Sequence, residues 1–265
     1  MGGTNANTAN GGIGFIGTGN MGAALARAVR RQLPQARLVL ANRTPGKAEA
    51  LAKELGCQTG GNAQAAACEM AFLGVKPGQV GPLLESLGPV LEEKRPLLVS
   101  MAAGVTLAEL EAFSAGTPAV RIMPNTPVAI GRGITLYTFG KGVAEAQKKA
   151  FLESMGATGS LIEIEEGLMG AGGKVAGCGP AFVDLFMEAL ADGGVACGLP
   201  RALALRLAEE MTAGAAMLAL ESGAHPGELK DQVCSPEGST IQGVRALEKA
   251  GLRSAVLEAV IAAGG

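Results

Sequence analysis

The sequence predicts an α/β domain with a mostly parallel sheet, followed by an all-helical domain. Up to about residue 165, short apolar runs alternate with helical patterns, and such alternation builds βαβ units. From about residue 166 the apolar residues recur at helical spacing, without a convincing strand. We therefore expect a flexible lead-in at 1–12, an α/β domain at 13–165 and a helical domain at 166–265.

The expected strands of the first domain follow one another with helices between them. Five apolar runs are "IGFIG" (13–17), "RLVLAN" (37–42), "MAFLGV" (70–75), "PLLVSMAAG" (96–104) and "AVRIMPN" (119–125). Between the first three lie helical patterns such as "MGAALARAVRRQL" (21–33) and "PGKAEALAKELG" (45–56). The runs "GITLYTFG" (133–140) and "TGSLIEIEEG" (158–167) are expected as the strands that close the domain.

The second domain is predicted to consist of long apolar helices. Helical patterns cover 179–199, 200–223 and 241–265. The stretch 202–220 is apolar nearly all round, interrupted mainly by Arg206, Glu209 and Glu210. Such a helix must be covered on most sides, so we expect helices of a second subunit to cover it and form a homodimer. A self-contained bundle is the alternative.

Composition excludes several classes of protein. The net charge of −2 offers no basic surface for nucleic acid. No apolar run reaches the length of a membrane span, and the first twelve residues lack the apolar core of a signal peptide. The five cysteines are odd in number and form no C-x-x-C pair, so we expect a cytoplasmic protein. No constellation of metal ligands can be assembled, so no metal is expected.

A glycine motif directly follows the first expected strand. "IGFIGTGNMG" places Gly17, Gly19 and Gly22 in G-x-G-x-x-G spacing, at the start of a predicted helix. In a Rossmann-type domain the first glycine allows the tight turn, the second the approach of a pyrophosphate, and the third the packing of helix on strand. The alternative is a glycine-rich turn that binds nothing.

The end of the second expected strand bears on the choice of dinucleotide. NAD-binding domains usually place an acid there for the ribose 2′-hydroxyl, whereas a 2′-phosphate needs a cation. This chain has Asn42, Arg43 and Thr44, with Lys47 near and no carboxylate. Arg43 can form a bidentate contact with a phosphate, so we expect NADPH, with NADH as a possible substitute. A plain surface turn would have a similar sequence.

Three later loops are expected at the same edge of the sheet, where open α/β sheets bind ligands. Small residues and prolines in them suit a rigid wall along a cofactor. The residues are Val75, Lys76 and Pro77; Met101, Ala102 and Ala103; and Met123, Pro124 and Asn125.

The segment "LKDQVCSPEGSTIQG" (229–243) contains a predicted helix start. Ser235 suits the N-cap, Pro236 the first helical position and Glu237 the first turn. A helix start also attracts anions, because unpaired N–H groups and the helix dipole point the same way.

Taken together, residues 13–258 resemble the pyrroline-5-carboxylate reductase family. The resemblance is carried by "GFIGTGNMG", "VKP", "AAGV", "MPNTP", "GCGPAF" and "HPGELKDQVCSPEGSTIQGVRALE", in the family's order. It implies reduction of 1-pyrroline-5-carboxylate to L-proline, the last step of proline biosynthesis, with hydride from NAD(P)H. It also implies a Rossmann domain, a helical domain that interlocks two subunits, and assembly of dimers into larger rings.

The same resemblance implies the site residues. The substrate carboxylate would lie on backbone amides at Gly238, Ser239 and Thr240, with Thr240 beside the imine nitrogen as the catalytic residue. Further substrate contacts map onto Glu166 and onto Gln232, where the family usually has Asn. Cofactor contacts implied by the family or expected from the loops are Ile16, Gly17, Thr18, Gly19, Asn20, Met21, Asn42, Arg43, Asn62, Val75, Lys76, Pro77, Met101, Ala102 and Ala103.

The inventory of side chains fits imine reduction. The one histidine, His225, stands before a proline, where a turn residue is expected more than a catalyst. A protonated imine is already electrophilic, so the enzyme chiefly has to align donor and acceptor. Thr240 is expected to hydrogen-bond the ring nitrogen, with a water relaying the proton as one possibility.

Departures from the family pattern leave two alternatives open. Glu237 stands where the family has the first glycine of "GGTT", and four hydroxyl-bearing positions are Gly173, Ala176, Cys178 and Phe182 here. One alternative is a β-hydroxyacid dehydrogenase with Lys174 as its catalytic lysine, although Cys178 stands where that class has Asn. The other is an NADP-binding protein that has lost or changed its activity.

Overall fold

The structure is a computed structural model and describes residues 11–263. The expected lead-in at 1–12 therefore lies outside the described residues, apart from Gly11 and Gly12. The chain forms two compact units, which divide between Gly177 and Cys178. Each unit is described by itself.

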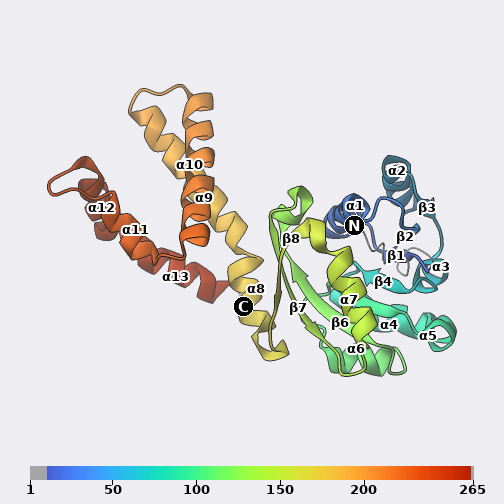
Figure 1. Ribbon diagram of the computed structural model, residues 1–265. Coiled ribbons are helices and arrows are strands. Elements are labelled where there is room, and N and C mark those ends of the chain that lie inside the picture. Colours follow the sequence, from blue (N-terminus) through green and yellow to red (C-terminus); the bar gives the residue numbers. More distant parts are fainter. Residues whose placement is uncertain (1–10, 264–265) are drawn as a thin grey trace, which may run out of the picture. The chain divides into compact units, whose positions relative to one another are not determined.

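An eight-stranded sheet forms the centre of the first unit (Figure 1). Its order is β3-β2-β1-β4-β5-β6-β7-β8, and all neighbours are parallel except β6 and β7. The strands are β1 Ile13–Ile16, β2 Leu38–Ala41, β3 Gln58–Thr59, β4 Met70–Leu73, β5 Leu97–Ser100, β6 Ala119–Pro124, β7 Gly133–Phe139 and β8 Gly159–Glu163. All seven strands expected from the sequence are confirmed, and the two-residue β3 is additional.

Helices and short 3-10 turns connect these strands. The α-helices are α1 Asn20–Gln32, α2 Pro45–Leu55, α3 Asn62–Ala66, α4 Val80–Ser86, α5 Gly88–Lys94, α6 Leu107–Phe113, α7 Glu145–Ser154 and α8 Met169–Ala176. The 3-10 turns are η1 Pro77–Gln79, η2 Thr126–Ile130, η3 Gly156–Thr158 and η4 Glu166–Leu168. Because the strands from β1 to β6 run parallel, the loops after β1, β2, β4, β5 and β6 leave the sheet at one edge.

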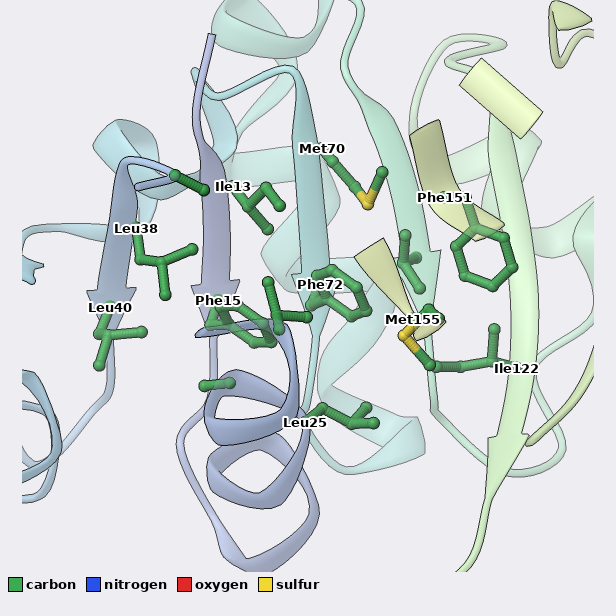
Figure 2. Close-up of a cluster of buried hydrophobic side chains, with 14 of the residues drawn as sticks. Ile13, Phe15, Leu25, Leu38, Leu40, Met70, Phe72, Ile122, Phe151 and Met155 are labelled. Carbon is green, nitrogen blue, oxygen red and sulfur yellow. The ribbon is translucent and has the colours of Figure 1, made fainter. Parts of the chain in front are cut away.

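The core consists of two layers, one on each face of the sheet. Successive side chains of a strand point to opposite faces, so Phe15 and Phe72 belong to one layer and Ile16 and Leu73 to the other. Figure 2 shows the first layer, in which the rings of Phe15 and Phe72 stack with their centroids 4.6 Å apart, above Leu25 of α1. Burial on both faces explains why these strands are continuous apolar runs in the sequence.

Helix α8 packs with the first compact unit, which extends to Gly177, beyond the domain boundary that the sequence predicts at 165/166. That domain boundary stays a prediction. The side chain of Asn125 bridges α8 and the sheet. Its Nδ2 donates to the Ala176 carbonyl at 3.0 Å, and its Oδ1 accepts from the Ile134 amide at 2.8 Å. Gly173 on the same helix lies against Met123, whose Cε would be 3.2 Å from an added Cβ. Helical periodicity alone could not show that this helix packs on β6 and β7.

The second unit is entirely helical, as predicted. Its helices are α9 Gly179–Ala196, α10 Arg201–Ser222, α11 Pro226–Gln232, α12 Ser239–Lys249 and α13 Leu252–Ala262. The pattern at 241–265 is two helices, because Gly251 takes a left-handed conformation with φ +79° between them. Within the part of the chain that the structure describes, no helix is long and apolar enough to cross a membrane.

The helical unit leaves much of its apolar surface uncovered. Helices α9 and α10 pack together through Ala191, Ala204 and Ala208 (Figure 1). On the remaining sides of α10 the leucines stay exposed, with Leu207 at 50% and Leu220 at 79% of their maximal area. Apolar side chains gathered in this way mark an interaction surface, as the sequence of 202–220 predicted.

Candidate active site

The glycine loop after β1 has the geometry that the motif predicts. Gly17 has φ +97°, and an added Cβ would lie 2.4 Å from the carbonyl oxygen of Gly74. An added Cβ on Gly22 would lie 2.1 Å from the Gly17 carbonyl oxygen, so α1 packs directly on the loop. Around Gly19, by contrast, an added Cβ would meet nothing within 4 Å. Two glycines therefore allow close packing, and the third leaves open space for a ligand.

The start of α1 presents unpaired donors beside that space. The first helical hydrogen bond runs from the Ala23 amide to the Gly19 carbonyl at 2.8 Å. The amides of Asn20, Met21 and Gly22 donate to no acceptor among the described residues. Such amides at the positive end of a helix dipole bind phosphate oxygens.

A pocket of about 470 Å³ opens at this edge of the sheet. Its walls carry three cationic side chains, Arg43, Lys47 and Lys76, and no carboxylate. The predicted cofactor residues that line it are Ile16, Gly17, Gly19, Asn42, Arg43, Asn62, Val75 and Lys76. The sequence did not indicate Gln79 and Leu83, which also line it, because they follow the "GVKPG" loop without a motif of their own. The pocket suits an anionic ligand with a 2′-phosphate.

Asn42 also holds the pocket together. Its Oδ1 accepts from the Thr18 amide at 3.2 Å, and its Nδ2 donates to the Thr44 carbonyl at 3.0 Å. The bond from Thr18 joins the loops after β1 and β2, and the bond to Thr44 fixes the loop after β2; an aspartate could accept the first but has no N–H for the second.

The remaining predicted cofactor residues do not line this pocket. They are Thr18, Asn20, Met21, Pro77, Met101, Ala102 and Ala103. Thr18 and Ala102 are buried, at 5% and 3% of their maximal exposure. Met101, Ala102 and Ala103 follow β5, which is separated from β1 by β4. A cofactor contact at these positions stays a prediction.

Glu166 makes structural contacts inside the first unit. Its Oε1 accepts from the Leu107 amide, at the start of α6, at 2.7 Å. The same oxygen lies 3.3 Å from Nη1 of Arg121, whose side chain is only 9% exposed. A buried guanidinium without a counter-charge is destabilising, so this carboxylate has a role that the family resemblance did not indicate. Its predicted contact with substrate is untested.

The prediction of a helix start at Ser235 is wrong. Residues 235–238 form a turn in which the Gly238 amide donates to the Ser235 carbonyl at 3.1 Å. Pro236 occupies the second position and Glu237 the third, with φ +57°. A proline followed by a residue of positive φ is the pattern of a type II turn. Helix α12 therefore begins at Ser239, with Gly238 as its N-cap.

This turn explains the glycines that the family has at 237 and 238. A left-handed residue other than glycine costs roughly 1–2 kcal/mol, which Glu237 incurs here. At Gly238 an added Cβ would lie 2.4 Å from the Ser235 hydroxyl and 3.2 Å from the Ser235 carbonyl oxygen, so the Ser235 side chain would have to rotate to make room.

Three unpaired amides lie at the start of α12. The first helical bond is that of Gln242 to Gly238, and no side chain caps the helix. The amides of Ser239, Thr240 and Ile241 donate to no acceptor among the described residues. The Thr240 side chain lies in the same turn and is exposed. One short segment thus offers anion-binding amides and a hydroxyl.

Gln232 and His225 precede this turn in the sequence and belong to helix α11 and its N-cap. Gln232 is the last residue of α11 and is exposed. The Nδ1 of His225 accepts from the Gly227 amide at 3.0 Å and caps α11. His225 therefore has a structural role, as a helix cap where a turn residue was expected.

Protein-family models match both units. Residues 12–104 match "NADP oxidoreductase coenzyme F420-dependent", and residues 166–264 match "Pyrroline-5-carboxylate reductase dimerisation". Pyrroline-5-carboxylate reductase of Pisum sativum is 38% identical over 255 residues, covering 95% of this chain and 93% of the relative. The Escherichia coli enzyme is 38% identical over 253 residues, covering 94% of each chain. The chain belongs to the pyrroline-5-carboxylate reductase family.

Solved structures of pyrroline-5-carboxylate reductases share this fold along their whole length. The reductase of Coxiella burnetii has a TM-score of 0.87 at 32% identity and covers 97% of this chain and 96% of its own. That of Plasmodium falciparum, solved with NADP bound, has a TM-score of 0.84 at 31% identity and covers 97% of both chains. The predicted architecture, a Rossmann-type domain followed by the helical dimerisation domain of the reductases, is confirmed.

Proposed function

We infer that this protein reduces 1-pyrroline-5-carboxylate to proline with NAD(P)H; its relatives are named pyrroline-5-carboxylate reductases. The observation that carries the inference is the start of α12, where three unpaired amides and the Thr240 hydroxyl share one turn. An imino acid offers a carboxylate for the amides and a ring nitrogen for the hydroxyl. A β-hydroxyacid dehydrogenase would make no use of this segment.

The residues of the chain would bind and orient the substrate. The unpaired amides of Ser239, Thr240 and Ile241 are the proposed carboxylate site, and the Gly238 amide that the resemblance also implied is already bonded to the Ser235 carbonyl. Gln232 and Glu166 are further proposed contacts. Thr240 would hydrogen-bond the ring nitrogen, which becomes an amine. The bound dinucleotide supplies the hydride that reduces the C=N carbon. The residues of the chain align the substrate with the cofactor and provide groups that bind the charges of the substrate.

The direct test follows NADPH absorbance with purified protein and 1-pyrroline-5-carboxylate, and quantifies proline. Oxidation of NADPH with an equal amount of proline formed is expected. If NADPH binds but is not oxidised, the protein is a dinucleotide-binding relative without this activity.

We propose NADPH as the preferred cofactor, supported by the three cations and the absence of a carboxylate among the pocket residues. Arg43→Ala is expected to raise the KM for NADPH about 10- to 100-fold, because a charge-assisted contact to the 2′-phosphate contributes about 1.5–3 kcal/mol. Steady-state kinetics with each dinucleotide measures the change.

NADH is the internal control for Arg43→Ala, since it lacks the 2′-phosphate. Its KM should change less than about threefold, because only the contact to the phosphate is removed. An equal rise for both cofactors would show that Arg43 supports the loop and does not select the phosphate.

We propose that two subunits form a homodimer through the helical unit, and that dimers can assemble further. The exposed leucines of α10 and the match to a dimerisation family support this. Sedimentation analysis is expected to give at least twice the chain mass at micromolar concentration, and a stable monomer would contradict the proposal.

We further propose a cytoplasmic location. The support is the odd number of cysteines, all five of which are free thiols. Extracellular proteins of this size would more often pair them. Fractionation of the source cells tests the location.

A further inference from the structure

Glu237 is the feature of the α12 start that the proposed activity does not explain. It lies directly before the N-cap Gly238, in the turn that leads into the three unpaired amides. A carboxylate there carries the same charge as the group those amides would bind. It also occupies a left-handed backbone position, which residues other than glycine rarely take.

Neighbouring groups do not neutralise this carboxylate. Glu237 is exposed, and neither an ion pair nor a side-chain hydrogen bond holds it within the described residues. Of the nearby cations, Lys230 pairs with Asp231, Arg253 pairs with Glu248 at 2.6 Å, and Arg245 of α12 contacts the Gln242 side chain at 3.4 Å. The charge of Glu237 therefore acts on whatever anion binds at the amides.

The backbone conformation limits where that charge can be. The turn hydrogen bond from Gly238 to Ser235 fixes the position of Glu237 relative to α12, at 3.1 Å between donor and acceptor. Its side chain leaves the chain one residue before the N-cap, so its Cβ stays beside the helix start as long as the turn is intact. Left-handed residues that persist at such cost cluster at functional sites.

We propose that Glu237 sets substrate selectivity by weakening the binding of carboxylate-bearing imines at the start of α12. The proposal rests on the proposed reductase activity. Glu237 lowers the preference of the enzyme for 1-pyrroline-5-carboxylate over cyclic imines without a carboxylate. It acts on substrate affinity and leaves the alignment of the reacting atoms to Thr240.

Two substitutions separate the effect of the Glu237 charge from the effect of its left-handed backbone conformation. Glu237→Gln removes the charge and keeps a side chain at the left-handed position, whereas Glu237→Gly removes both. Each is assayed with 1-pyrroline-5-carboxylate and with 1-pyrroline, which has the same ring C=N bond and no carboxylate. Glu92→Gln, at an exposed position on α5 outside the cofactor pocket, controls for the change in net charge.

In both Glu237 variants the KM for 1-pyrroline-5-carboxylate is expected to fall about 3- to 10-fold. The reason is that each variant removes a negative charge several ångströms from the substrate carboxylate, at a partly solvated site. kcat/KM for 1-pyrroline should change less than about twofold. An unchanged or higher KM in Glu237→Gln, a fall only in Glu237→Gly, or an equal change with both imines would overturn the proposal.

Failure of the proposed function is a separate outcome. If the unaltered protein and both variants oxidise no NADPH with either imine, the reductase inference is wrong and the selectivity role goes with it. If the unaltered protein reduces 1-pyrroline-5-carboxylate and Glu237→Gln has the same KM, only the role of Glu237 is wrong.

Discussion

Replacing Thr240 with alanine is expected to lower kcat for 1-pyrroline-5-carboxylate about 100-fold. The hydroxyl stands in the first turn of α12, beside amides that would hold the substrate carboxylate. A preorganised donor aimed at an atom whose charge changes during reaction contributes about 2.7–4 kcal/mol to the barrier when removed in other enzymes. Steady-state kinetics at saturating NADPH measures the loss.

Thr240→Ser is the matched control, because it keeps the hydroxyl and removes only a methyl group. We expect it to keep kcat within about tenfold of the unaltered enzyme, since the remaining hydroxyl can still form the hydrogen bond. NADPH affinity should be the same in both variants, because the cofactor pocket is formed by the first unit alone. Equal losses in the alanine and serine variants would show that the hydroxyl is not the active group.

The strands and the glycine loop could be predicted from the sequence because local physics determines them. Strands such as 38–41 and 70–73 are buried on both faces, so their side chains are apolar throughout. Gly17 and Gly22 are needed because carbonyl oxygens lie where a Cβ would be. In each case, a parallel sheet with tight βα turns restricts which residue types fit, so the sequence shows a recognisable pattern.

The contacts that were missed depend on residues distant in sequence or on a single backbone angle. Glu166 binds the start of α6, 59 positions away, and no local pattern records that pairing. The sequence Ser-Pro-Glu has the composition of a helix start, and only the positive φ of Glu237 makes it a turn. The family glycines at 237 and 238 were the available signal, since a Pro-Gly pair favours a type II turn.

The glycine loop allows folding and cofactor binding to be separated by two substitutions of the same kind. Gly17→Ala is expected to destabilise the protein by about 2–4 kcal/mol, since it combines an unfavourable φ with an overlap against the Gly74 carbonyl. Because both overlapping segments border the pocket, NADPH binding should be lost as well. Thermal unfolding and fluorescence titration with NADPH measure the two effects.

Gly19→Ala should leave the fold unchanged and still abolish tight binding. Gly19 has φ −70°, which alanine accepts, and an added Cβ meets no atom within 4 Å. Stability should therefore stay within about 0.5 kcal/mol. The new methyl group would occupy the space through which the pyrophosphate approaches the unpaired amides of α1, so the Kd for NADPH should rise at least about tenfold. If Gly19→Ala binds NADPH normally, the dinucleotide does not lie across this loop, and the cations of the pocket hold some other anion.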